Sequence, residues 1–255
     1  MSGIGRRVLG WLRPTPRVRA AAQSHDGHPD RFADRVDAGR RLAAELLAVE
    51  PGLRGADVVV LGLPRGGVPV AAEVAAALGA PLDVIVVRRL GVPWQPELAM
   101  GAVGEGGVQV LDARVVQHTG VSDAEVGAVR ERERAAVEAR ATALRAGRAR
   151  LDLVGRTALV VDDGLATGST ARAACQVAWH LGADRVVLAV PVGAADTVAA
   201  FPDADRVVCV LTPVDFAAVG QFYRDFSATS DAEVVRLLDD AASRARDDPG
   251  PTLTP

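Results

Sequence analysis

Apolar residues form two alternating kinds of segment along most of this chain. Short continuous apolar runs are typical of strands buried on both faces of a parallel sheet, and such runs occupy residues 57–63, 82–87, 158–161, 185–190 and 206–211, with a weaker one at 108–111. Between them we expect helices at 31–47, 68–78, 122–146, 169–178, 194–200 and 230–238. Apolar residues recur near helical spacing in the first, and the helices from Ser122 and Ser230 each begin with a capping box. This alternation predicts an α/β fold with a doubly wound, mainly parallel sheet.

The two ends of the chain differ from this pattern. Residues 1–30 are rich in Arg and contain no acid before Asp26, and Pro14 and Pro16 interrupt them. We interpret this segment as a disordered tail, with a weak contact to acidic surfaces or an organelle transit peptide as alternatives. The folded domain is expected over residues 31–240, and residues 241–255 as a second tail rich in Asp and Pro.

Composition limits the class of protein. A chain of 255 residues with 49% hydrophobic content can bury one substantial core, and a net charge of −3 argues against a nucleic-acid partner. No apolar run approaches the ~20 residues that span a bilayer, so we expect no membrane partner. Two isolated cysteines suit packing roles in a reducing compartment, which favours a cytoplasmic location.

The most informative stretch is TALVVDDGLATGST, at residues 157–170. It predicts a buried strand that ends in two acids, a short turn of mostly small residues, and a helix that begins with hydroxyl side chains. Backbone N–H groups at a helix start are unpaired and attract phosphate, and neighbouring carboxylates can accept from a pair of ribose hydroxyls. The stretch therefore predicts a phosphosugar site, whereas each half alone would be an ordinary strand-to-helix turn.

Two other phosphate-binding motifs are excluded by the same residues. The P-loop requires a Lys before its Ser or Thr, and this sequence contains no Lys. The dinucleotide fingerprint requires Gly-x-Gly-x-x-Gly after a strand, and the segment from Gly164 to Gly168 does not supply it.

At these residues the sequence resembles the type I phosphoribosyltransferases, and most closely a group of bacterial members whose acceptor is not settled. The resemblance implies their fold, with a mobile lid and a small hood, and binding of phosphoribosyl pyrophosphate (PRPP) with Mg²⁺. It assigns the ribose to Asp162 and Asp163, which would contact the metal only through PRPP. It assigns the 5′-phosphate to a loop made of Ala166, Thr167, Gly168, Ser169 and Thr170.

Two further segments match the family. Arg65, Gly66 and Gly67 stand where relatives have a pyrophosphate loop, in which the peptide before the basic residue is often cis; we therefore expect a cis Pro64–Arg65 bond. Arg88 and Arg89 follow the next strand, where a basic pair begins the lid in relatives. Residues 90–107 contain many Gly and Pro without a clear periodicity, so we expect an irregular lid that is mobile until ligand binds.

The acceptor would lie under the hood, at residues 212–226, which contains aromatic residues in a chain with few of them. Its likeness to the 6-oxopurine enzymes places Phe216 where an aromatic stacks on the base. Those enzymes have a catalytic acid where this chain has Ala166, a difference shared with adenine phosphoribosyltransferases. Glu97 and Glu105 in the lid are then the candidate bases.

The resemblance predicts transfer of phosphoribosyl to a nitrogen nucleophile such as a purine-like base, with Arg88 and Arg89 assisting departure of pyrophosphate. It also allows a homodimer. The alternative is a regulator that binds PRPP without turning it over, although the sequence shows no separate DNA-binding helix pair. A further alternative, an unrelated phosphate-binding domain, is less favoured because Arg65 and Arg88 also match.

Overall fold

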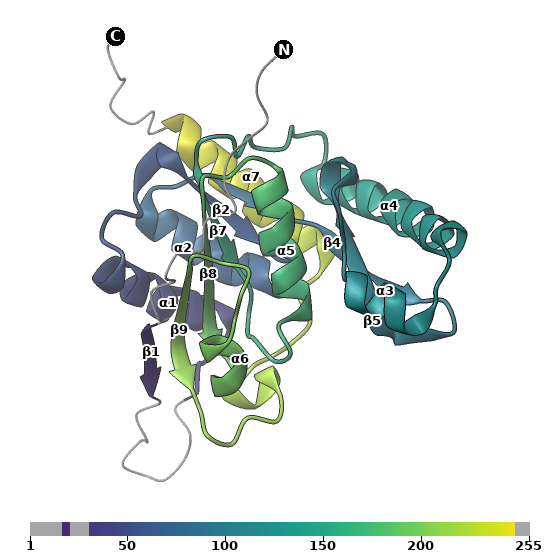
Figure 1. Cartoon of the computed structure of the whole chain (residues 1–255). Helices are drawn as coiled ribbons and strands as arrows, with labels where there is room; N and C mark the ends of the chain where they lie inside the picture. Colours follow the sequence, from purple (N-terminus) through teal and green to yellow (C-terminus); the bar gives the residue numbers. More distant parts are fainter. Residues whose placement is uncertain (1–16, 21–30, 248–255) are drawn as a thin grey trace.

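The computed structural model describes residues 17–20 and 31–247 and confirms the α/β fold (Figure 1). Its central sheet has the strand order β1-β9-β8-β7-β2-β3, and all its pairs are parallel. The strands are β1 (Arg17–Ala20), β2 (Val58–Gly62), β3 (Leu82–Val84), β7 (Thr157–Val161), β8 (Arg185–Val192) and β9 (Arg206–Thr212).

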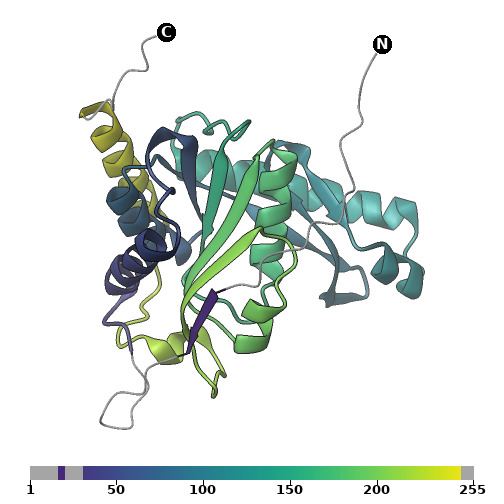
Figure 2. The same cartoon turned by 60° about the vertical axis from the view of Figure 1, so that its left-hand side comes forward.

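Helices cover both faces of this sheet, as the turned view shows (Figure 2). One face carries α1 (Arg35–Val49), α2 (Gly67–Leu78) and α7 (Asp231–Asp247); the other carries α5 (Ser169–His180) and α6 (Ala195–Ala199). The alternation of side chains along β2 divides the core accordingly. Val58 and Val60 pack in the first layer, and Val59 and Leu61 pack in the second. Burial on both faces explains why these strands are continuously apolar.

The direction of winding reverses between β2 and β7, which are adjacent in the sheet. From β2 the sheet continues to β3, whereas from β7 it continues to β8 and β9. Ligands of such sheets bind outside the carboxyl ends of the strands at this reversal. The segments after β2 and β7 are those that carry the predicted pyrophosphate and phosphate loops.

A second, antiparallel sheet projects from the side of the central one (Figure 1). It consists of β4 (Val87–Val92), β5 (Gln95–Gly104) and β6 (Gln109–Leu111), and it is flanked by α3 (Ala113–Thr119) and α4 (Asp123–Arg145). The prediction of an irregular segment over 90–107 is therefore wrong, because most of it is a β-hairpin. Its mobility and its closure over ligand stay predictions. Two of its glycines allow close pairing: a Cβ on Gly91 would lie 2.5 Å from the Pro96 carbonyl oxygen, and one on Gly101 2.2 Å from that of Val110.

Other element boundaries also differ from the predictions. α1 begins at Arg35 because Asp34 caps it through the backbone N–H of Asp37, so residues 31–34 are not helical. Strand β3 ends at Val84, helix α3 was not predicted, and α7 continues to Asp247 beyond the expected end at 238.

The ends of the chain are only partly described. Within residues 1–30, where the sequence predicts a disordered tail, Arg17–Ala20 forms an edge strand beside β9. The remainder of that tail, residues 1–16 and 21–30, and the last residues, 248–255, lie outside the described part. Among the described helices, none is long and apolar enough to cross a membrane.

After Thr212, the last residue of β9, the hood contains little regular structure beyond the 3₁₀ turn η3 (Val219–Phe222). It is held against the segment before α1 by backbone hydrogen bonds: Phe32 N–H donates to the Phe222 carbonyl at 2.8 Å, and Arg224 N–H donates to the Phe32 carbonyl at 2.9 Å. The rings of Phe32, Phe222 and Tyr223 pack into a small core of their own.

Candidate active site

The acid pair lies immediately after β7, at the switch point of the sheet. The backbone N–H of Asp163 donates to Oδ1 of Asp162 at 2.9 Å. Oδ2 of Asp163 accepts a hydrogen bond from Nε of Arg35, also at 2.9 Å. Burial raises the pKa of Asp162 well above its usual value, and the neighbouring charge of Asp163 raises it further. Burial also raises the pKa of Asp163, although the Arg35 guanidinium opposes that effect. Both acids are thus partly withdrawn from bulk water at the end of β7.

The phosphate loop, residues 166–170, turns into α5. Gly168 has a φ of +74°, a left-handed conformation that favours glycine, and Ser169 is the first residue of the helix. The first main-chain bond of the helix runs from Arg172 N–H to the Gly168 carbonyl, so the preceding N–H groups have no partner within it. Thr197 fixes the loop by donating from Oγ1 to the Ala166 carbonyl at 2.8 Å. The exposed side chains of Thr167 and Thr170 add hydroxyl donors beside this helix start.

The pyrophosphate loop, residues 64–67, packs against the acid pair. Its Pro64–Arg65 peptide is cis, as predicted. A Cβ added to Gly67 would lie 2.7 Å from the Val161 carbonyl oxygen and 2.9 Å from Cα of Asp162, so the two loops approach at backbone distance. Arg65 is exposed, and one guanidinium nitrogen lies 3.8 Å from a carboxylate oxygen of Asp231.

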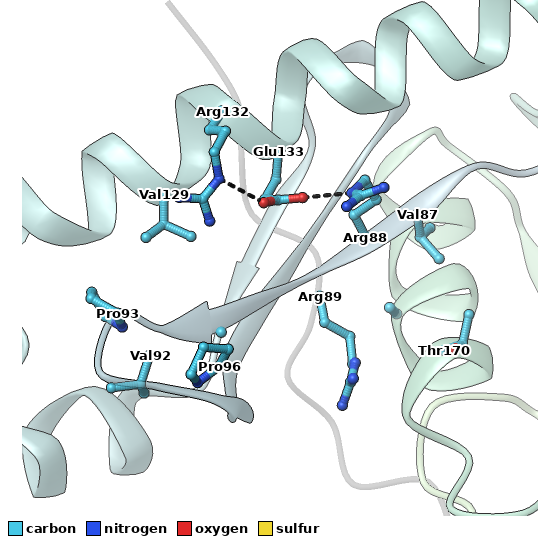
Figure 3. A pocket seen from close by; sticks show the side chains of 12 residues that line it. Val87, Arg88, Arg89, Val92, Pro93, Pro96, Val129, Arg132, Glu133 and Thr170 are labelled. Atoms are coloured by element: carbon cyan, nitrogen blue, oxygen red, sulfur yellow. Dashed lines mark hydrogen bonds and ion pairs between the residues drawn. The ribbon is translucent and has the colours of Figure 1, made fainter.

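Arg88 and Arg89 begin the hairpin and line a pocket of about 510 Å³ (Figure 3). The pocket lies between β4, α4 and the start of α5, where Thr170 forms part of its wall. Arg88 forms an ion pair with Glu133 on α4, and Glu133 also accepts from Arg132 at 3.0 Å. Arg89 extends away from Glu133, on the side of the hairpin where Thr170 lies (Figure 3). The basic pair is thus divided between two environments.

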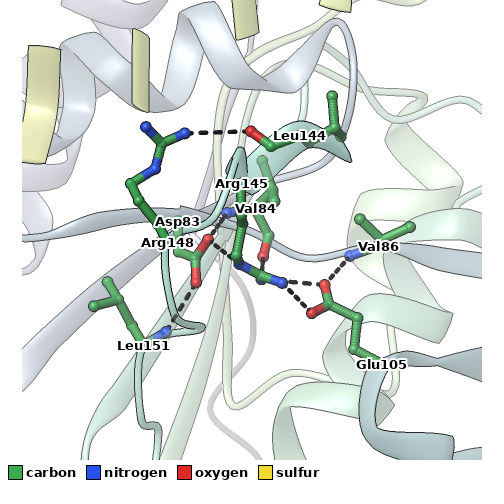
Figure 4. A network of polar contacts seen from close by, with 8 residues as sticks. All are labelled: Asp83, Val84, Val86, Glu105, Leu144, Arg145, Arg148 and Leu151. Atoms are coloured by element: carbon green, nitrogen blue, oxygen red, sulfur yellow. Dashed lines mark hydrogen bonds and ion pairs between the residues drawn. The ribbon is translucent and has the colours of Figure 1, made fainter. Parts of the chain in front are cut away.

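Glu97 and Glu105 have very different surroundings. Glu97 is exposed on β5. Glu105 is buried and forms an ion pair with Arg145, which also binds Asp83 at 2.8 Å (Figure 4). The other oxygen of Glu105 accepts from the backbone N–H of Val86 at 3.0 Å. Since both its oxygens are engaged in a structural network, we do not retain Glu105 as a candidate base.

In the hood, Phe216 is half-buried and stacks on Phe222, with ring centroids 5.7 Å apart and planes inclined by 15°. Tyr223 contributes to the site directly, since its hydroxyl donates to the backbone carbonyl of Asp163 at 2.7 Å. The hood therefore touches the acid pair, as the predicted position over the end of the sheet requires.

The sequence did not indicate the role of Arg35. The sequence pattern assigns it only to a packing helix over 31–47, yet it binds a carboxylate 128 positions away. A cation is disfavoured in the first turn of a helix, but the helix predicted from residue 31 does not place Arg35 there, so the sequence carries no usable signal.

Comparison with known proteins agrees with this geometry. The phosphoribosyl transferase domain family matches residues 30–226, which is more than half of the sequence. The chain belongs to this family. A protein of Mycobacterium tuberculosis named as a phosphoribosyl transferase is 59% identical over 211 residues, covering 82% of this chain and 47% of that protein. This family member thus spans about half the length of the curated relatives it matches.

A solved structure resembles the family member along most of its length. The protein TT1426 from Thermus thermophilus is 42% identical and superposes with a TM-score of 0.74, covering 82% of this chain and 98% of that one. The family assignment and the predicted type of sheet are thereby confirmed.

Proposed function

We propose that this phosphoribosyl transferase family member transfers the phosphoribosyl group of Mg²⁺-PRPP to a nitrogen nucleophile and releases pyrophosphate. In this reaction a C–N bond forms at the anomeric carbon, the C–O bond to pyrophosphate breaks, and its electron pair leaves with pyrophosphate. The nitrogen nucleophile loses a proton. Family membership supports the reaction class, and the arrangement of the loops at the switch point supports the substrate.

The observation that carries this proposal is the contact between the acid pair and the pyrophosphate loop. A Cβ on Gly66 would lie 2.0 Å from Oδ2 of Asp163, and one on Gly67 would lie 3.1 Å from Oδ1 of Asp162. A ligand whose diol binds the acid pair would therefore place its anomeric substituent beside residues 64–67. Its 5′-phosphate would extend to the start of α5, where N–H groups without a partner in the helix favour an anion.

The residues present fit Mg²⁺ carried by the substrate. In the described residues, no group of three or more His, Cys, Asp or Glu side chains could hold a metal ion. Mg²⁺ readily keeps several waters and takes substrate phosphates as ligands, so Asp162 and Asp163 would act on it through PRPP and water. When bound, the ion neutralises charge on pyrophosphate.

The arginines near the site suit the charge that develops during the reaction. Arg65 stands at the pyrophosphate loop. Arg89 extends on the side of the hairpin where Thr170 lies, and Arg88, paired with Glu133, lines the same pocket. Guanidinium groups aimed at the leaving group would stabilise its growing negative charge. Closure of the hairpin over these groups would exclude water, which otherwise hydrolyses PRPP.

For the acceptor we propose a purine-like nitrogen heterocycle stacked on Phe216. The hood presents aromatic surface next to Asp163, which suits a flat ring. Ala166 supplies no acid at the position used by the 6-oxopurine enzymes, so Glu97 is the remaining candidate for the base.

The proposal is tested by calorimetry with Mg²⁺-PRPP followed by turnover with a panel of bases. We expect the wild-type protein to bind, and Asp162→Ala/Asp163→Ala to lose binding while its circular dichroism is unchanged. Equal affinity in the folded double variant would contradict the site. Tight PRPP binding without turnover of any base would instead favour the regulator alternative.

A further inference from the structure

Arg35 is a nearly buried cation that joins the acid pair to the segment after the hood. Its Nε donates to Oδ2 of Asp163 at 2.9 Å, and its Nη2 lies 2.8 Å from the same oxygen in the ion pair. Its Nη1 donates to the Ser227 carbonyl at 2.7 Å. The side chain is only 11% exposed, so these protein contacts replace much of the hydration of the guanidinium. Such a group costs free energy to bury unless its partners stay in place.

Aromatic rings also hold the guanidinium. Its Cζ lies 4.0 Å from the ring centroid of Phe226 and 6.0 Å from that of Tyr223. Both distances are within the range of cation–π attraction. Tyr223 in turn contacts the backbone of Asp163 through its hydroxyl. Arg35 is therefore enclosed by the segment that would carry the acceptor.

The backbone fixes where Arg35 stands. The carbonyl of Ala33 accepts from the Asp225 N–H at 2.9 Å, in addition to the bonds that pair Phe32 with the hood. Arg35 follows two residues later, in the first turn of α1, where the helix dipole disfavours a cation. The nearby Asp163 carboxylate offsets this cost, so the ion pair is part of the architecture and not an incidental contact of a flexible side chain.

The ion pair with Arg35 involves only one of the two carboxylate oxygens of Asp163. Nε and Nη2 of Arg35 both contact Oδ2. Gly66 packs against the same oxygen, so closely that a Cβ on residue 66 would not fit. Oδ1 is not part of the pair. Held by Oδ2 between Arg35 and Gly66, the carboxylate has little freedom to turn.

Building on the proposed function, we propose that Arg35 is a positioning residue for the ribose-binding carboxylate. It holds Asp163 by Oδ2, so that Oδ1 can accept from a ribose hydroxyl of PRPP, and it couples this carboxylate to the hood. Binding of the sugar would then stabilise the acceptor-binding segment through Arg35, Tyr223 and Phe226.

The test compares Arg35→Met, Asp163→Asn and the double variant by calorimetry with Mg²⁺-PRPP. Each single change is expected to lower affinity on the order of tenfold, the size typical of losing a hydrogen bond to a charged group. If Arg35 acts through Asp163, the double variant binds no more weakly than Asp163→Asn. Additive losses, or an affinity that is unchanged or raised in Arg35→Met, would overturn the proposal.

Control variants separate positioning from folding. Arg40→Met removes another arginine of α1, which is paired with Glu73, and should leave affinity unchanged. Arg35→Lys keeps the charge without the two-nitrogen fork, so we expect it to recover part of the loss. If Arg35→Met does not fold, Arg35→Lys and Tyr223→Phe carry the test, each with a smaller loss expected. Wild-type affinity in both would overturn the proposal.

Hydrogen exchange measures the coupling to the hood. PRPP should slow exchange in residues 216–227 of the wild-type protein and have a smaller effect in Arg35→Lys at matched saturation. An equal effect in both proteins would overturn the coupling. Failure of the wild-type protein to bind PRPP would refute the proposed function itself, which is a distinct outcome.

Discussion

Gly66 leaves the space that the carboxylate of Asp163 occupies. A Cβ at residue 66 would lie 2.0 Å from Oδ2 and 2.8 Å from Cγ of that side chain, well inside van der Waals contact. The backbone of Gly66 is in the ordinary helical region, with φ −62° and ψ −33°. A side chain is therefore excluded here by contact with Asp163 and not by the backbone conformation.

Gly66→Ala should consequently displace the Asp163 carboxylate. We expect PRPP affinity to fall at least tenfold and stability to fall by about 1–3 kcal/mol, the usual cost of overpacking. Calorimetry and thermal unfolding measure the two effects. Gly127→Ala on α4 is the matched control, since a Cβ there meets nothing within 4 Å and should leave both quantities unchanged or raise stability slightly. Wild-type binding in Gly66→Ala would show that the loop shifts without affecting the site.

The raised pKa of Asp162 predicts how stability depends on pH. Because the folded protein holds a proton on this group at pH values where the unfolded chain has lost it, stability should decrease as pH rises from about 4 toward the raised pKa. Asp162→Asn removes the charge, so it should be more stable than wild type at neutral pH, with the difference vanishing near pH 4. Unfolding in denaturant at several pH values measures this, and PRPP binding should be weakened in the same variant. An equal difference at all pH values would contradict the pKa assignment.

Much of the fold followed from local pattern. Continuous apolar runs between helical periodicities specify buried parallel strands, and the segment TALVVDDGLATGST contains the acid pair and the phosphate loop within fourteen successive residues, 157–170. The side-chain roles that the sequence does not predict depend on partners distant in sequence. Arg35 acquires its role from Asp163, and Glu105 from Arg145, which lies 40 residues further on.

The hairpin of β4 and β5 was not predicted for a different reason, which is the role of its glycines. Its glycine content predicts mobility, whereas in the structure Gly91 and Gly101 allow the close approach of paired strands. Composition alone does not distinguish these uses, because the same residue relaxes an isolated loop and permits tight packing in a sheet.

The two glutamates named as candidate bases should respond differently to substitution. Glu105→Gln weakens a buried ion pair with Arg145 and should cost about 3 kcal/mol of stability, seen as a lower Tm. Glu97→Gln changes an exposed side chain and should leave Tm unchanged while lowering kcat with PRPP affinity kept. Thermal unfolding and steady-state kinetics on both variants check this. Full activity in Glu97→Gln would remove it as the base.

The ion pair between Arg88 and Glu133 predicts a restraint on the hairpin. If Arg88 must leave Glu133 to reach pyrophosphate, Glu133→Gln should raise PRPP affinity, by up to about fivefold because a partly exposed pair is worth up to about 1 kcal/mol. Glu131→Gln on the same helix removes a pair with Arg134 and should have no effect. Calorimetry measures affinity, and hydrogen exchange should show greater protection of residues 87–104 when PRPP is bound. A reduced affinity in Glu133→Gln would instead assign the pair a supporting role in the bound state.

The stacked rings of Phe216 and Phe222 bear on the acceptor. Phe222 is buried and supports the hood, whereas Phe216 remains partly exposed and can offer ring surface to a ligand. Phe216→Ala should raise the KM for the acceptor about 3- to 10-fold, as expected for loss of one aromatic contact, and leave PRPP affinity unchanged. Phe216→Tyr keeps the ring and should remain close to wild type, and Val214→Ala, at a residue of the hood that is 97% exposed, serves as the control for general disturbance. An unchanged acceptor KM in Phe216→Ala would place the base elsewhere in the site, whereas equal losses for PRPP and acceptor would show that the hood had been disrupted as a whole.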